Sequence, residues 1–235
     1  MARENVSYGD TPVASMGAST RGSFLVKTYL HLLGAMVLFI ILEVAIFNSG
    51  AKEAILTVAG QSWYLVFGAF ILVSWIGSHV AHSAKSKPIQ YLALVGFVSM
   101  WAIIFTPMIE MANSMTPAGD SSLLQSAVLM TLLAFSTLSA IVFFTGKDFA
   151  FMRSFLMFAG LVAFFTIIAA MVFGFQLGVG FSAIMVLFAG GAILYDTSEI
   201  LHHYPEDRYV GASLQLFSSI ALLFWYILRI FTSRD

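Results

Sequence analysis

The stretch Leu123–Thr145 reads LLQSAVLMTLLAFSTLSAIVFFT, a run of 23 residues without a charged side chain. An α-helix needs about 20 mostly apolar residues to cross the hydrocarbon core of a bilayer. The run is continuously apolar rather than alternating between apolar and polar residues, which excludes a lipid-exposed β-strand. It therefore predicts a transmembrane helix.

Six further stretches have the same apolar character, and turn-forming residues such as Ser49-Gly50, Gly146, Gly174 and Pro205 separate them. The fold class predicted from this pattern is an all-α integral membrane protein, a seven-transmembrane helix bundle. The expected spans are Tyr29–Asn48, Trp63–Val80, Ile89–Met108, Leu123–Thr145, Met152–Phe173, Leu177–Leu201 and Val210–Phe231.

The composition agrees with a protein that lies in the lipid bilayer. Hydrophobic residues make up 60% of the 235 residues and charged residues 10%, whereas soluble domains have about 45–50% and about 25%. The formal net charge of −1 leaves no basic surface for nucleic acid. Cysteine is absent, which excludes disulfides, thiolate nucleophiles and Cys-ligated metals.

The orientation follows from the lysines and arginines outside the spans. Residues 1–28 are polar and lack the apolar region of a signal peptide, so we expect a flexible cytoplasmic N-terminal tail before a transmembrane domain at 29–235. The tail and the loops after the second, fourth and sixth spans hold eight Lys and Arg residues, against three on the other side. Because positive charges favour the cytoplasm, the N-terminus is predicted to be cytoplasmic.

Charges at membrane depth are costly and therefore mark candidate functional sites. Glu43 in the first span and Arg229 in the last lie at similar depth near the outer side. We expect them to form an ion pair, which would either lock two helices together or serve as an extracellular gate.

A denser polar cluster lies at the cytoplasmic end of the sixth span. Asp196, Glu199 and His203 are spaced i, i+3 and i+7 and so share one face of a helix. Carboxylates and histidines in a cavity can change charge near neutral pH, although helix ends at the headgroups also collect such residues without a function. Zinc would use the same residue types, but the spacing matches no known motif, and we expect no metal.

Motifs of intramembrane enzymes are missing. Tyr195-Asp196 resembles half of an aspartyl-protease pair, yet no Gly-x-Gly-Asp supplies the second acid. The sequence also lacks a rhomboid-like Gly-x-Ser-Gly, a His-Glu-x-x-His and a lysine in the last span that could hold retinal. We therefore expect no catalytic residue and no cofactor.

The segment Gly191-Ala-Ile-Leu-Tyr-Asp-Thr-Ser-Glu-Ile200 at the end of the sixth span resembles the Bax inhibitor-1 (transmembrane Bax inhibitor motif) family. Residues 145–155 and 222–230 support the resemblance, which is strongest to the YccA-like bacterial branch. That branch is known for binding and modulating the membrane-anchored AAA+ protease FtsH. The resemblance thus implies a multi-pass protein of the bacterial inner (plasma) membrane, with FtsH and its prohibitin-like companions HflK and HflC as expected partners.

The same resemblance implies an alternative function. Some family members are pH-sensitive calcium leak channels in which two aspartates, on the sixth and seventh helices, share a proton and gate the pore. Asp196 matches the first aspartate, whereas Ser219 stands at the position of the second. A calcium or cation leak gated near Asp196, with Glu199, Ser219 and His203 as further pH-sensing or gating candidates, is therefore the second expectation.

Overall fold

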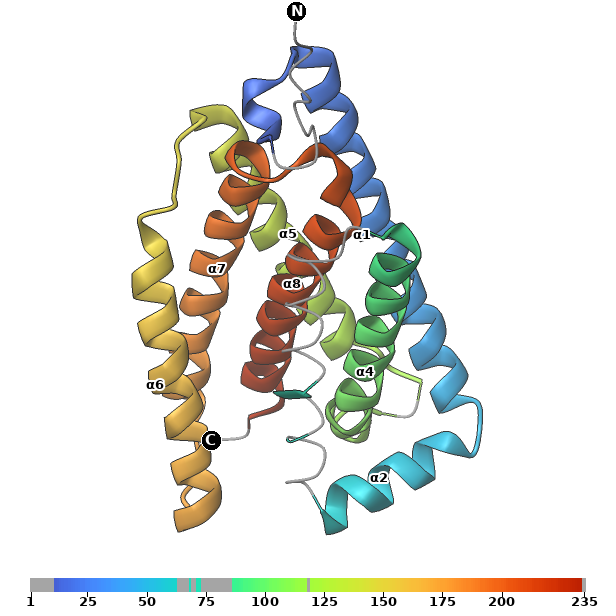
Figure 1. Cartoon of the computed structure of the whole chain (residues 1–235). Helices are drawn as coiled ribbons and strands as arrows, with labels where there is room; N and C mark the ends of the chain where they lie inside the picture. Colours follow the sequence, from blue (N-terminus) through green and yellow to red (C-terminus); the bar gives the residue numbers. More distant parts are fainter. Residues whose placement is uncertain (1–10, 63–67, 69–70, 73–85, 118, 234–235) are drawn as a thin grey trace, which may run out of the picture.

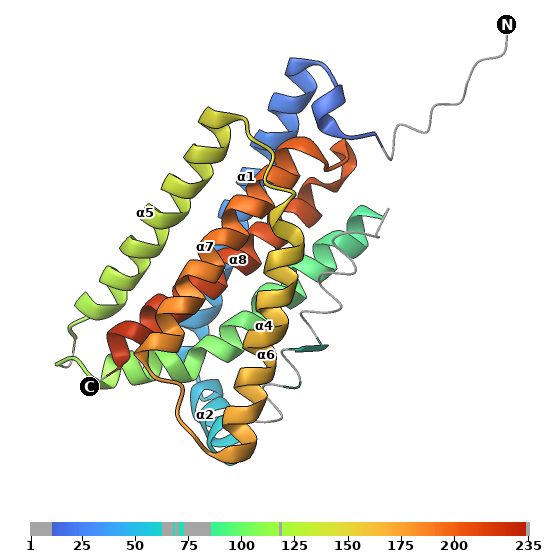
Figure 2. The same cartoon turned by 90° about the vertical axis from the view of Figure 1, so that its left-hand side faces the viewer.

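The structure is a bundle of long helices. The computed structural model describes residues 11–62, 68, 71–72, 86–117 and 119–233, and no strand occurs among them. Six of its helices are long and apolar enough to cross a membrane, and they pack lengthwise in Figures 1 and 2. They are α1 (Ala18–Phe47), α4 (Lys87–Ser114), α5 (Ser122–Thr145), α6 (Met152–Phe173), α7 (Val179–His202) and α8 (Tyr209–Thr232).

The predicted all-α membrane fold is confirmed. The bounds of α6 coincide with the prediction, and α5, α7 and α8 agree with it within two residues at each end. Gly146 and Gly174 end α5 and α6 with φ angles of 58° and 73°, a left-handed conformation that glycine adopts without steric cost. The expected second span, Trp63–Val80, lies outside the described residues except at positions 68, 71 and 72.

The first helix differs from the prediction because it begins at Ala18 rather than at residue 29. Residues 18–28, expected to belong to a flexible tail, are therefore helical. Val13 and Phe24 explain the difference, since both side chains are fully buried. The Val13 amide also donates to the Tyr204 carbonyl at 2.8 Å, which attaches this segment to the connection between α7 and α8.

Val13 provides a test of this attachment. We expect Val13→Ala to lower the free energy of unfolding by about 1–3 kcal/mol, because a fully buried side chain loses its packing. Val26→Ala is the matched control, since the Val26 side chain is 59% exposed, and it should change stability by less than about 0.5 kcal/mol. Thermal unfolding of the two purified variants would measure the difference. Equal midpoints for both variants would contradict the attachment.

A short helix on the outer side was not predicted. Helix α2 (Ala51–Gln61) follows α1 directly, where a short turn at Ser49-Gly50 was expected. Its 11 residues are too few to span a bilayer, and Figure 1 shows it lying across the end of the bundle. Lys52 on α2 pairs with Glu110 on α4 at 3.4 Å, so a half-buried ion pair connects the two helices.

Helix α8 is the centre of the bundle. Seventeen of its 24 residues are buried, and it packs against α1, α4, α5 and α7. Helix α6, in contrast, has no buried residue and packs on α7 at the edge of the molecule. Polar side chains on α8 are therefore surrounded by protein rather than by lipid, and they need partners within the bundle.

Candidate functional site

The most buried acidic group of the predicted cytoplasmic cluster is Asp196, whose side chain points from α7 toward α8. Asp196 is 6% exposed. Its Oδ1 accepts a hydrogen bond of 2.6 Å from Nε2 of Gln215, and its Oδ2 accepts one from the Ser219 hydroxyl. Gln215 and Ser219 are four residues apart and so lie on one face of α8. The carboxylate thus connects the two helices through both of its oxygens.

Tyr204 fixes the direction of this hydrogen-bond chain. Its hydroxyl donates to Oε1 of Gln215, so the amide must turn its NH₂ group toward Asp196. Tyr204 belongs to the connection between α7 and α8 and is itself 4% exposed. Burial and the nearby carboxylates of Asp196 and Glu199 raise the pKa of Tyr204, so the tyrosine remains a hydrogen-bond donor at neutral pH. The chain runs from Tyr204 through Gln215 and Asp196 to Ser219.

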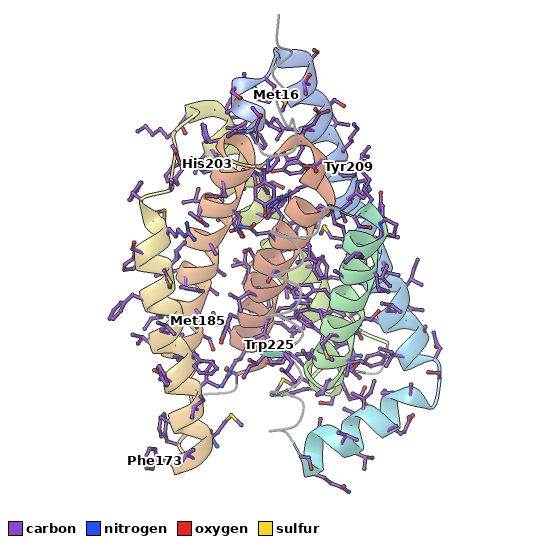
Figure 3. The ribbon with its side chains drawn as sticks, in the orientation of Figure 1. Met16, Phe173, Met185, His203, Tyr209 and Trp225 are labelled. Atoms are coloured by element: carbon purple, nitrogen blue, oxygen red, sulfur yellow. The ribbon has the colours of Figure 1, made fainter. Side chains whose placement is uncertain are left out.

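Glu199 and His203 belong to a second polar cluster. Asp196 and Glu199 lie on α7, and His203 is the residue directly after its last turn. The Nδ1 atom of His203 lies 3.8 Å from the Glu199 carboxylate, and its Nε2 atom lies 3.4 Å from Asp148. Asp148 precedes α6, and its neighbour Phe149 donates its amide proton to the Ser198 hydroxyl at 2.8 Å. This cluster attaches the connection between α5 and α6 to the cytoplasmic end of α7, where Figure 3 labels His203.

Asp148 gives the second cluster a pH dependence. Partial burial raises the pKa of Asp148, but the Ala150 amide and the charges of His203 and His202 outweigh this effect and lower it below its usual value. A lowered pKa stabilises the fold above the unfolded pKa of about 3.9, and this stabilisation is lost as the pH falls through the folded pKa.

We therefore expect Asp148→Asn to lower the midpoint of thermal unfolding by about 1–3 °C at about pH 5.5, which is below the ordinary histidine pKa of about 6.5. This is the range of an exposed ion pair. The difference from the wild type should shrink as the pH falls below about 4. Asparagine keeps the acceptor for the Ala150 amide, so the variant removes the charge alone. A difference that stayed constant down to pH 3 would contradict the electrostatic explanation.

The expected pair of Glu43 and Arg229 does not form, so that prediction is wrong. Arg229 donates from Nη2 to the Leu177 carbonyl at 2.8 Å, and neither carboxylate oxygen of Glu43 has a hydrogen-bond partner among the described residues. Arg229 belongs to α8, and its side chain lies on a different face of that helix from the one beside Glu43. Glu43 lines a cavity with Phe217 and Phe224, while Arg229 lines another with Leu222.

Four residues that complete these clusters were not predicted from the sequence, namely Gln215, Tyr204, Ser198 and Asp148. Gln215 is the one that the sequence could most easily have indicated, because it is a polar residue inside an apolar helix, four positions before Ser219. In the described part of the chain, no group of three or more His, Asp or Glu side chains could hold a metal ion.

A model of one protein family matches residues 21–235, almost the whole chain. The family is described as "Inhibitor of apoptosis-promoting Bax1". The match includes every residue of the two polar clusters.

Similar proteins come from bacteria, plants and fungi. The chain is 32% identical over 161 residues to the Escherichia coli protein "Modulator of FtsH protease YccA". The aligned region covers 66% of this chain and 71% of the relative. It is 28% identical to an Arabidopsis thaliana "BI1-like protein" over 98% of this chain and 85% of that one. The Schizosaccharomyces pombe "Bax inhibitor 1" is 28% identical over 94% of this chain and 80% of its own.

Proposed function

Because the chain belongs to the Bax inhibitor-1 family, we propose that it is a non-enzymatic regulator that binds an FtsH-type AAA+ protease and restrains the degradation of other membrane proteins. It is a multi-pass protein of the inner membrane. The observation that carries the proposal is the similarity to the Escherichia coli protein named as a modulator of that protease. The prohibitin-like proteins HflK and HflC would join the complex.

The attachment of the N-terminal segment supports a protein that the protease engages but degrades poorly. An AAA+ protease pulls on a chain end, and the predicted orientation places this end in the cytoplasm. Val13 is the first buried side chain in the part of the chain that the structure describes, and Pro12 forms an isolated bridge with Pro205. A protease that pulled on the N-terminus would first have to separate Pro12 and Val13 from the connection between α7 and α8.

Affinity purification from native membranes in mild detergent tests the proposal. We expect the tagged protein to recover an AAA+ protease and its prohibitin-like companions, identified by mass spectrometry. An unrelated multi-pass protein with the same tag is the control. Recovery of the tagged protein alone, or equal recovery of the protease with the control, would contradict the proposal.

A deletion of residues 2–10 tests the role of the N-terminal end and keeps Val13. The removal of the first 20 residues, all within the tail that the sequence predicted to be flexible, would also remove Val13 and the beginning of α1. We expect the shorter deletion to leave thermal stability unchanged and to slow turnover of the protein in cells that contain the protease. Unchanged turnover would exclude this end as the site of engagement.

Asp196 supports the second candidate function, a cation leak. Its carboxylate is buried where α7 meets α8, at the position that the family resemblance assigns to a gating aspartate. This candidate predicts calcium flux in reconstituted vesicles that changes between about pH 6 and 8, and Asp196→Asn should abolish the change. Flux with the same pH dependence in the variant would exclude Asp196 as the gate.

A further inference from the structure

Glu43 is a buried carboxylate without a partner. Its side chain is 7% exposed, and neither oxygen has a hydrogen-bond partner among the described residues. An unpartnered carboxylate at membrane depth is costly, and such residues persist in membrane proteins mainly where they serve a function. Asp196 shows the contrast, because both of its oxygens accept hydrogen bonds.

Glu43 lines a cavity of about 420 Å³ in the outer half of the bundle, between α1, α4, α5 and α8. The walls are mainly apolar and aromatic, with Phe39, Phe105, Phe217 and Phe224 among the lining residues. Sites for small organic molecules have volumes of about 300–1,000 Å³ and combine apolar walls with few polar groups. The volume and lining therefore fit a ligand of this size.

The charge of the lining is of one sign. No Lys, Arg or His lines the cavity in the part of the chain that the structure describes, and Glu43 is its one ionisable side chain there. Among the described lining residues, Thr131 alone carries a hydroxyl group, and it already donates to the Ala127 carbonyl at 2.7 Å. A negative group among aromatic rings attracts a cation both through its charge and through the ring faces.

From these observations we propose that the cavity beside Glu43 binds a lipophilic organic cation, whose apolar body contacts the aromatic walls and whose positive charge pairs with the carboxylate. Access is from the bilayer, because Val44 and Val128 also line the cavity and are 55% and 41% exposed on the surface of the bundle. A lipophilic cation partitions into the bilayer and reaches this opening directly.

Two ions of nearly equal shape and opposite charge test the proposal. We would measure binding of tetraphenylphosphonium and of tetraphenylborate to the full chain in nanodiscs, with empty nanodiscs to subtract partition into lipid. The wild type should bind the phosphonium at least about tenfold more tightly than Glu43→Gln does, because the variant keeps the shape of the side chain and loses its charge. The borate should show no such preference for the wild type.

Two further variants keep the test decisive. Glu110→Gln makes the same chemical change on α4, outside the lining of the cavity, and should leave phosphonium binding unchanged. Ala221→Leu fills part of the cavity with Glu43 intact, and should weaken phosphonium binding even if Glu43→Gln fails to fold. Equal phosphonium binding by the wild type and either cavity variant would overturn the proposal, as would equal binding of the two ions by the wild type.

Discussion

Replacement of Asp196 by leucine is expected to lower the free energy of unfolding by about 2–4 kcal/mol. Leucine cannot accept the hydrogen bonds from Gln215 and Ser219, and each buried donor left without an acceptor costs about 1–3 kcal/mol. Hydrogen bonds between transmembrane helices average nearer 0.6 kcal/mol. The expected cost for the two donors together is therefore less than twice the upper value for one buried donor. Thermal or steric-trapping measurements of unfolding in detergent would give the value.

Asp196→Asn is the matched control and should cost less than about 1 kcal/mol. Its amide oxygen can accept from Gln215, and its NH₂ group can donate to the Ser219 oxygen. Tyr204 continues to hold Gln215 in the required direction. A loss as large as that of the leucine variant would mean that the charge of Asp196, rather than its hydrogen bonds, holds α7 to α8.

The bounds of the spans follow from sequence wherever a helix faces lipid. Helix α6 is the clearest example, because it has no buried residue and its apolar run ends at Gly174 with a left-handed turn. Helix α1 was predicted less well. Its first turns contain Ser, Thr, Arg and Gly residues that lower the hydropathy, while the buried Val13 and Phe24 that hold them depend on contacts with distant segments.

The candidate site shows more clearly that contacts between distant segments cannot be predicted from the sequence. The family resemblance placed Ser219 opposite Asp196, and the two side chains are in contact. Counting residues along an apolar helix gives only the depth of a side chain. It does not give the direction in which the side chain points around the helix axis. Glu43 and Arg229 therefore matched in depth, but Glu43 lies beside one face of α8 and Arg229 is on another face of that helix. Asp148 contacts His203 from a loop whose path cannot be predicted from helical periodicity.

Replacement of Ser219 by aspartate is expected to be tolerated at pH 5 and to destabilise the bundle by about 4 kcal/mol at pH 8. The Ser219 hydroxyl donates directly to Asp196, so a carboxyl group at this position would lie against the first one. A single shared proton would satisfy the pair. Its loss would leave two like charges in contact, which costs about 4 kcal/mol at a separation of about 4 Å and an effective dielectric constant of about 20.

The variant Ser219→Asn controls for the size of the side chain, and its stability should change between the two pH values no more than that of the wild type does. A Ser219→Asp variant whose stability did not change between pH 5 and pH 8 would contradict the proximity of the two groups. Unfolding at the two pH values, measured in the same detergent, provides the comparison. The result tests the packing of α7 on α8 independently of any function.

The same variant separates the two candidate functions, because it restores the acidic pair that the family resemblance assigns to pH-sensitive leak channels. We expect vesicles with the wild-type protein to hold calcium at any pH between about 6 and 8, and vesicles with Ser219→Asp to leak it in a pH-dependent way. Ser219, in place of a second aspartate, would then explain why the protein regulates a protease without conducting calcium. If the wild type leaks as well, and Asp196→Asn stops it, one buried carboxylate hydrogen-bonded to Gln215 is sufficient for gating.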